Sequence, residues 1–349
     1  MKLTLATLIM LASFTLPVVG NASTTLSSEP LVQPSIDQPA TSERSAAPSQ
    51  QNSQVEQWVY IAQDHRQDDA ARADALRNLA RFPSQNSLVA VVRALQDENM
   101  LIREAAIVGA EPYQFAHRWR MIAPLLNDSE WQVRMAATTN LIRDFSNMSS
   151  DQQQVMTPPV AELKAYLLSR QDPSSQLLLA DVYRWHQEWD KAQVLYEQRL
   201  KVEQGNSQIR LSMADNLRAQ GLNKQALAVL NNGLEHQPQE ANLYYSQALT
   251  LVRLEQRNDA AAAMRKAAEL AKTNSYFWYL NGVLQENVDL AESTKSFEQA
   301  YLISGAPEQL YAVCDIYVRY ANEKAGDCID ELAKIAPSDV IEELESKRN

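Results

Sequence analysis

Small residues recur at a fixed spacing in the second half of this 349-residue chain. Two series of alanines each advance by 34 residues: Ala180, Ala214 and Ala248, and Ala192, Ala226 and Ala260. The segments "LLLADVYRWHQEWDKAQVLYEQRL" and "LSMADNLRAQGLNKQALAVLNNGL" begin at the same spacing, at Leu177 and Leu211. A period of about 20–50 residues indicates stacked repeats, each of which buries its apolar face only against its neighbours.

The 34-residue unit resembles the tetratricopeptide repeat (TPR), a helix–turn–helix hairpin with small residues where its helices cross. In the fourth unit, "YFWYLNGVLQENVDLAESTKSFEQAYLI", Trp278, Gly282, Phe297 and Ala300 match the aromatic and small positions of that family, with one residue deleted in the turn. A weaker fifth unit begins at Leu310. We predict about five repeats over 173–337 and a C-terminal capping helix over 338–349.

A second period, of 31 residues, precedes the first. "ALQDENMLIREAAI" recurs as "PLLNDSEWQVRMAAT", so that Asp97 and Arg103 correspond to Asp128 and Arg134, and one step back Arg103 corresponds to Arg72. These units resemble HEAT repeats, in which a turn Asp and a helix Arg form a ladder between neighbours. We predict about three HEAT-like units over 55–148. A connecting helix follows within 149–172, and we expect Pro158 and Pro159 to start it, because proline suits a first helical turn.

Composition agrees with a helical protein. Glycine, which supplies the positive-φ turns of β-rich folds, accounts for only 8 residues, well below the roughly 7% of an average chain. We therefore predict an all-α fold, an α–α superhelix (solenoid) of HEAT-like hairpins followed by tetratricopeptide repeats.

The N-terminus, "MKLTLATLIMLASFTLPVVGNAS", has the pattern of a secretory signal peptide. Lys2 precedes an apolar run, and Gly20 and Ala22 place small residues at the −3 and −1 positions of a cleavage site. A retained membrane anchor is the alternative, but Pro17 and the shortness of the run argue against it. We expect cleavage near Ala22, a periplasmic location, and no membrane insertion of the mature chain.

The next segment, 23–54, is dominated by Ser, Thr, Pro and Gln and has no periodic apolar face. Such a composition buries too little surface to offset the entropy of ordering. We predict a disordered linker.

Cys314 and Cys328 are the only cysteines. In an oxidising compartment they can form a disulfide, and in the repeat frame this bond would join the two helices of the fifth unit. Two buried thiols are the alternative.

Several function classes find no support in the sequence. The formal charge of −11 argues against a nucleic-acid partner, which needs a basic face. Catalytic motifs such as H-E-x-x-H and G-x-S-x-G are missing, and none of the histidines has a second ligand at helical spacing: His65, His117, His186 and His236. We predict no enzyme activity, no cofactor and no metal site.

The order of the two repeat types, with runs such as "RMIAPLLNDSEWQVRMAAT", resembles the C-terminal module of exported multihaem cytochromes c over about 85–335. No C-x-x-C-H motif is present for covalent haem, so no haem-binding residue can be transferred. The resemblance implies a haem-free relative of that scaffold, working beside a cytochrome.

In tetratricopeptide arrays the first helix of each repeat lines the concave surface. We predict a partner-binding groove there, with acid/base pairs at one end and tyrosines at the other: Asp181, Arg184, Asp215, Arg218, Tyr245, Tyr276 and Tyr279. Tyrosine suits protein recognition because it joins a large apolar ring to a polar tip. Alternatively, the pairs are solvated i,i+3 contacts and the tyrosines pack between units.

These features favour a non-catalytic periplasmic scaffold that binds a protein or peptide partner in the cell envelope, alongside exported cytochromes. An adaptor for envelope or cell-wall maintenance is the alternative. An enzyme or a small-ligand carrier is less favoured.

Overall fold

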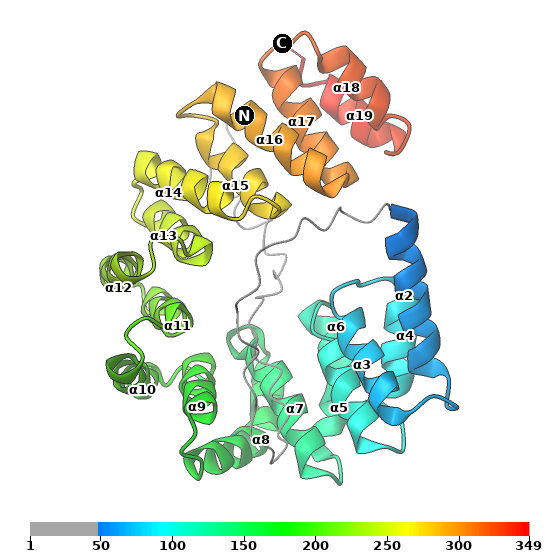
Figure 1. Cartoon of the computed structure of the whole chain (residues 1–349), viewed down its shortest axis with the longest axis vertical. Helices are drawn as coiled ribbons and strands as arrows, with labels where there is room; N and C mark the ends of the chain where they lie inside the picture. The colour runs from blue at the N-terminus through cyan, green and yellow to red at the C-terminus, as the bar shows by residue number, and fades with distance from the viewer. Residues whose placement is uncertain (1–47, 349) are drawn as a thin grey trace. The chain divides into compact units, whose positions relative to one another are not determined.

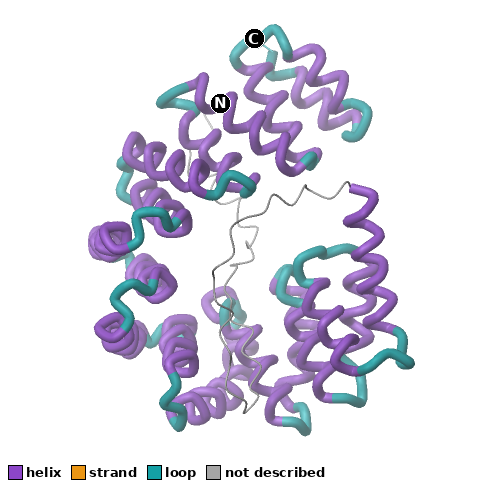
Figure 2. The backbone as a smooth tube through the Cα atoms, viewed as in Figure 1, coloured by secondary structure: helices purple, strands orange, loops and turns teal. Residues whose placement is uncertain are grey.

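The computed structural model describes residues 48–348, which form helices joined by short connections, with no strand among them (Figure 2). The predicted all-α fold class is confirmed. The chain divides into two compact units, unit 1 ending at Glu188 and unit 2 beginning at Trp189. The predicted signal peptide and most of the predicted linker lie outside the described residues. The linker prediction fails at its C-terminal end, because helix α2 begins at Pro48 and not after residue 54.

Unit 1 is a succession of helices in which α3, α5 and α7 stack on one another. Short turns connect them, so consecutive helices form pairs (Figure 1, blue to green). In chain order the elements are α2 (Pro48–Gln63), α3 (Asp69–Leu79), α4 (Gln85–Ala94), α5 (Met100–Gly109), α6 (Phe115–Ile122) with the 3₁₀ segment η1 (Ala123–Asn127), α7 (Trp131–Ile142), η2 (Phe145–Asn147), α8 (Ser150–Leu168) and α9 (Pro173–Trp185).

A ladder of ion pairs connects neighbouring helix pairs of unit 1. Arg72 on α3 donates to Asp97 in the next turn at 2.6 Å, and Arg103 on α5 donates to both carboxylate oxygens of Asp128 at 2.8 Å. Arg103 also donates to two carbonyls of its own preceding turn, at 2.8 and 2.9 Å. The guanidinium fork thus joins one turn to the next, the arrangement that the HEAT resemblance implies.

The ladder holds its aspartates in the charged form. Burial works to raise the pKa of Asp128, but the hydrogen bonds that it accepts from Arg103 and from the backbone of Glu130 outweigh burial and lower the pKa. The pKa of Asp97 is lowered in the same way, against burial, by the backbone of Asn99 and by Arg72. Both carboxylates therefore stabilise the folded chain most when they are ionised.

The connecting helix α8 begins earlier than the prolines predict. Its start is a capping box, in which the Ser149 hydroxyl accepts from the backbone of Gln152 and the Gln152 side chain accepts from the backbone of Ser149. Pro158 and Pro159 lie inside the helix. The expectation that they start it is wrong, because the upstream cap and the burial of Met156, Pro159 and Val160 outweigh the two missing backbone donors.

Unit 2 is a run of helical hairpins (Figure 1, green to red). The alanines that set the 34-residue period here, Ala192, Ala214, Ala226, Ala248 and Ala260, are fully buried between helices. The helices are α10 (Trp189–Val202), α11 (Ser207–Ala219), α12 (Asn223–His236), α13 (Ala241–Arg253), α14 (Arg257–Leu270), α15 (Ser275–Gln285), α16 (Leu290–Ser304), α17 (Pro307–Arg319), α18 (Ala325–Leu332) and α19 (Ser338–Glu345).

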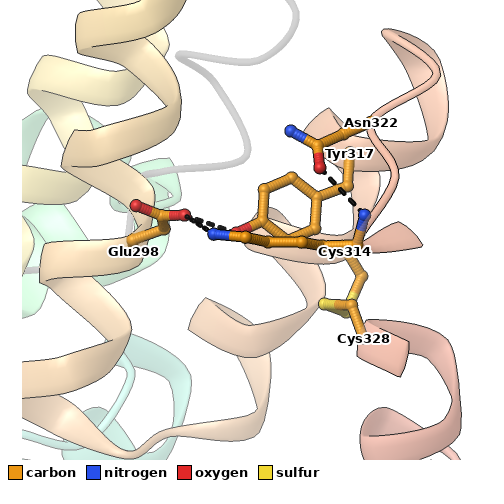
Figure 3. Close-up of a disulfide and its surroundings, with 6 residues drawn as sticks. Glu298, Cys314, Tyr317, Asn322 and Cys328 are labelled. Carbon is orange, nitrogen blue, oxygen red and sulfur yellow. Dashed lines mark hydrogen bonds and ion pairs between the residues drawn. A yellow bond between two sulfur atoms is a disulfide. The ribbon is translucent and has the colours of Figure 1, made fainter. Parts of the chain in front are cut away.

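A disulfide joins Cys314 on α17 to Cys328 on α18, with the two Cα atoms 5.4 Å apart (Figure 3). In the turn between these helices, the backbone of Asn322 donates to the carbonyl of Tyr317 at 2.8 Å. The Tyr317 hydroxyl donates to Glu298 on the preceding helix α16. The bond therefore closes the last hairpin of unit 2, while Tyr317 fastens that hairpin to its neighbour.

Replacing Arg103 by Met should destabilise unit 1 by about 3 kcal/mol, because it leaves the buried Asp128 carboxylate without its cation. Urea unfolding combined with hydrogen–deuterium exchange of α5 and α7 measures the loss. The double variant Arg103→Met/Asp128→Asn should recover part of it, because the asparagine oxygen can still accept from Glu130 while the unpaired charge is gone.

The pH dependence of stability tests whether the Arg103–Asp128 pair causes this loss. The pKa of Asp128 is lower in the folded chain than in the unfolded one, so its stabilisation is complete above the ordinary aspartate pKa and is lost as the pH falls through the folded-state value. The double variant should show a flatter acid dependence than the wild type. An equally steep dependence would contradict the ladder explanation, as would an equal loss on Asp74→Asn, which disturbs only the exposed pair with Arg77.

Replacing Cys314 and Cys328 together by Ser should weaken the terminal hairpin. The cysteines are 14 residues apart, and closing a loop of about this length is worth ~3 kcal/mol in the chain-entropy model. Faster hydrogen exchange is expected in α17 and α18 and not in α11 and α12. Unchanged exchange in α17 would show that packing alone holds the hairpin.

Candidate functional site

The seven residues predicted to line a groove fall into two groups. Asp181 and Arg184 lie on α9 of unit 1, where they form an ion pair of 3.1 Å and Arg184 also lies over the Trp185 ring at 5.4 Å. The other five lie on the first helices of three hairpins of unit 2: Asp215, Arg218, Tyr245, Tyr276 and Tyr279. The candidate site therefore consists of these five residues of unit 2.

Tyr245, Tyr276 and Tyr279 form a connected row, which we call the tyrosine strip. The rings of Tyr245 and Tyr276 meet edge to face with their centres 6.4 Å apart, and Tyr245 stacks on the buried Phe277 at 4.9 Å. Tyr279 packs edge to face on Phe297 at 5.6 Å. All three tyrosines are half-buried. Each ring is thus held by the core on one side, and the packing alternative accounts for that part of its surface.

The strip is neutral over the ordinary pH range. Burial raises the pKa of Tyr245 far above that of a free phenol, and the neighbouring Tyr276 adds to the effect. Burial likewise raises the pKa of Tyr276 and Tyr279, and for Tyr279 the nearby Tyr276 and Asp315 contribute further. The strip therefore offers hydroxyl groups that remain protonated and can donate as well as accept.

The strip has a charged pair at each end. At the α11 end, Asp215 is bound to Arg218, and the Asp215 side chain is 44% exposed. At the α17 end, Asp315 pairs with Arg319 at 2.6 Å, and Arg319 also binds Glu286, the residue directly after α15. The pair of Asp315 and Arg319 was not among the residues predicted from the sequence. An Asp followed by an Arg three or four residues later on the first helix of a repeat is the signal that would have found it.

Arg218 has a structural role that the sequence did not suggest. Its guanidinium donates to the carbonyl of Ser246 at 2.8 Å, to the Ser246 hydroxyl at 2.9 Å and to the Thr250 hydroxyl at 3.0 Å. All three acceptors lie on α13. Arg218 therefore clamps α11 to α13, whereas Asp215 and the tyrosines remain the predicted groove residues of unit 2.

No part of the chain that the structure describes gathers His, Cys, Asp or Glu into a set that could hold a metal ion. His186 contacts Lys164 and Glu188, each at 2.9 Å, and its ring packs on Phe145 at 4.6 Å. Among the described helices, none is long and apolar enough to cross a membrane.

No protein-family model matches this chain, and neither does any curated protein. Solved structures do match. One of MamA is 17% identical, covering 48% of this chain and 95% of its own, with a TM-score of 0.39. YrrB, described as a TPR protein with an unusual peptide-binding site, is 19% identical over 50% of this chain and 92% of its own, with a TM-score of 0.41. A MamA fragment from Desulfovibrio magneticus RS-1 is 19% identical over 48% and 96%, with a TM-score of 0.36. These values are too low to carry an argument about function.

Replacing Arg218 by Met should lower the free energy of unfolding by about 2 kcal/mol, because three hydrogen bonds to α13 are lost and the buried Thr250 hydroxyl loses a donor. Arg218→Lys should rescue only part of this, since a single ammonium cannot reproduce the planar fork. Thermal unfolding and hydrogen exchange at α13 measure both effects. If Arg218→Met left exchange at α13 unchanged, the clamp would be refuted and Arg218 would return to the partner-facing set.

Proposed function

We propose that this chain is a non-catalytic protein-interaction scaffold whose tyrosine strip binds a peptide segment of a partner protein. The observation that carries the proposal is the row of half-buried tyrosines on α13 and α15, each with one face fixed by the core. A ring that is already immobilised loses little entropy when a partner binds, and its surface combines apolar area with a hydrogen-bonding tip. Such residues are enriched at the energetic centres of interfaces.

The chemistry of the strip defines the segment that suits it. Neutral phenols can donate to backbone carbonyls and accept from backbone amides, while the rings cover apolar side chains. Asp215, the most exposed charge at the α11 end, can accept from a lysine or arginine of the partner. We therefore propose a segment with apolar side chains along the strip and a basic residue at the α11 end.

We propose the cell envelope as the setting, with export through the N-terminal signal and a periplasmic location. The signal-like N-terminus and the disulfide between the only two cysteines support this. The Arg–Asp ladder supports HEAT-like repeats in unit 1, and the tandem order of the repeats favours a partner among exported cytochromes. An adaptor for envelope or cell-wall maintenance would use the same strip with another partner.

Photo-crosslinking at the strip tests the proposal directly. A photoreactive phenylalanine derivative in place of Tyr276 should crosslink the partner in intact cells. Tyr301 on α16 is the matched control, because it is also half-buried in unit 2 but lies on the second helix of its hairpin. Mass spectrometry then identifies the partner from the crosslinked product.

Binding of that partner should then fall by about tenfold or more in Tyr276→Ala and stay near wild type in Tyr301→Ala. Crosslinks from position 301 alone, or equal losses in both variants, would sink the proposal. Cell fractionation and the mass of the thiol-blocked chain check the periplasmic location in the same strain.

A further inference from the structure

A second candidate surface lies in unit 1, around helix α4. A hollow of about 510 Å³ separates α4 from α6 and η1, and its lining is mainly apolar: Leu88, Val92, Leu95, Met121, Pro124 and Leu125. Val92, an apolar residue in the last turn of α4, is 38% exposed. A second hollow, of about 610 Å³, lies between α4 and α2, and the two share Gln96. Helix α4 is therefore a ridge with a hollow on each flank.

The elements that border the apolar hollow carry only positive formal charges, whereas Asp97 and Glu98 line the hollow on the other flank of α4. Helices α4 and α6 and the segment η1 contain no Asp or Glu. Their charged side chains are three arginines, of which Arg118 is buried and paired with Asp144, which follows the C-terminal end of α7. Arg93 and Arg120 are exposed and, among the described residues, form no ion pair. Arg93 donates to Gln63 at 2.6 Å, and Arg120 makes one long hydrogen bond, of 3.4 Å, to a carbonyl.

This pattern contrasts with the rest of the molecule. The chain has a formal charge of −11, yet Arg120, which has no carboxylate partner among the described residues, lines the apolar hollow, and Arg93, also without one, lines the hollow on the other flank of α4. We name the surface formed by α4, α6 and η1, with Arg93 and Arg120 at its edges, the α4 face. Its apolar hollow offers a place for partner side chains, and its arginines offer charge-assisted hydrogen bonds to carboxylates.

We propose that the α4 face docks an acidic amphipathic segment of a partner protein, whose apolar side chains enter the hollow between α4 and α6 while its carboxylates pair with Arg120 and Arg93. Charge complementarity selects this occupant, because a basic or neutral segment would leave both arginines unpaired. The surface is independent of the tyrosine strip, which lies in unit 2 and has its charges already paired.

Selection of short random peptides displayed on phage, with the full chain as target, tests the proposal. Peptides that bind at the α4 face should combine Leu, Met or Phe with Asp or Glu. For a synthetic peptide from this selection, Val92→Lys and Arg120→Glu should each weaken binding by about tenfold or more. Replacing the peptide's acids by Lys should abolish binding to the wild type and restore it to Arg120→Glu.

Matched controls lie elsewhere in unit 1. Leu168→Lys alters an exposed apolar residue of α8, and Arg81→Glu reverses an exposed arginine beyond the end of α3. Both variants should bind the peptide like the wild type. Tyr276→Ala should also bind it like the wild type, because a loss of partner binding in that variant tests the tyrosine strip and not the α4 face. Circular dichroism confirms that each variant is folded, and Arg120→Glu keeps the test valid if Val92→Lys does not fold.

Each alternative occupant of the α4 face predicts a different experimental result. Selected peptides without acids, or binding unchanged in Arg120→Glu, would overturn the proposal. Binding of the full chain to vesicles that contain anionic lipid, lost in Val92→Lys, would assign the face to a membrane surface instead. A photoreactive residue in place of Val92 on the purified chain should crosslink only to residues that line the hollow. A crosslink to another segment of the same chain would identify that segment as the occupant, and one between chains would identify a second copy, and either would overturn the proposal.

Discussion

The close approach of helices at buried small residues sets the geometry of unit 2. Ala214, Ala248 and Gly282 occupy the same place on α11, α13 and α15, and all are buried. At Gly282 an added Cβ would lie 2.8 Å from the Phe297 ring, so even alanine would force that ring to move. In α17 the same place is taken by Cys314, a buried residue that also forms the disulfide. Contact at these points fixes the rotation of each first helix about its own axis.

That rotation determines where the tyrosine strip lies. Tyr245 and Tyr279 are each three residues before the buried small residue of their helix, so the 34-residue period brings them to equivalent positions. The position directly after the small residue carries Asp215 on α11 and Asp315 on α17. The candidate site therefore follows from the packing: residues at fixed offsets from a helix crossing must share one face of the stack.

In unit 1, ion pairs help to fix the register of neighbouring helix pairs. Its Arg–Asp pairs join consecutive turns through geometry that a shifted register could not reproduce, because each guanidinium must reach carbonyls behind it and a carboxylate ahead of it. Buried pairs of this kind add little net stability, but breaking one is costly, and they specify which repeat lies next to which. Since the connection is made at the turns, the outer faces of α4 and α6 remain free to carry other chemistry.

Features that repeat along the chain can be predicted from the sequence, whereas contacts between residues outside the repeat pattern cannot. The small residues, the cysteines and the ladder arginines could be found from the sequence because each repeats at a fixed interval or is unique. Arg218 was assigned to a partner because its acceptors Ser246 and Thr250, 28 and 32 residues away, belong to no motif. The predicted start of α8 at Pro158 was wrong because the capping box that starts the helix lies upstream, at Ser149. The acid-free α4 face is a property of helices distant in sequence, so it becomes visible only once they are known to share a hollow.

The two surfaces differ in how they would hold a partner. Around the tyrosine strip the formal charges already have partners within the chain, and only Asp215 is exposed enough to accept from a basic residue as well. Affinity there should therefore come mainly from ring area and neutral hydrogen bonds, which salt screens little. At the α4 face the arginines have no carboxylate partners within the described chain, so association there should be steered by charge and weakened by salt. Because the net charge of the chain is strongly negative, an acidic segment would approach the α4 face against a long-range repulsion. Only a segment with apolar side chains that fit the hollow would remain bound, and this requirement makes the face selective for amphipathic partners over merely acidic ones.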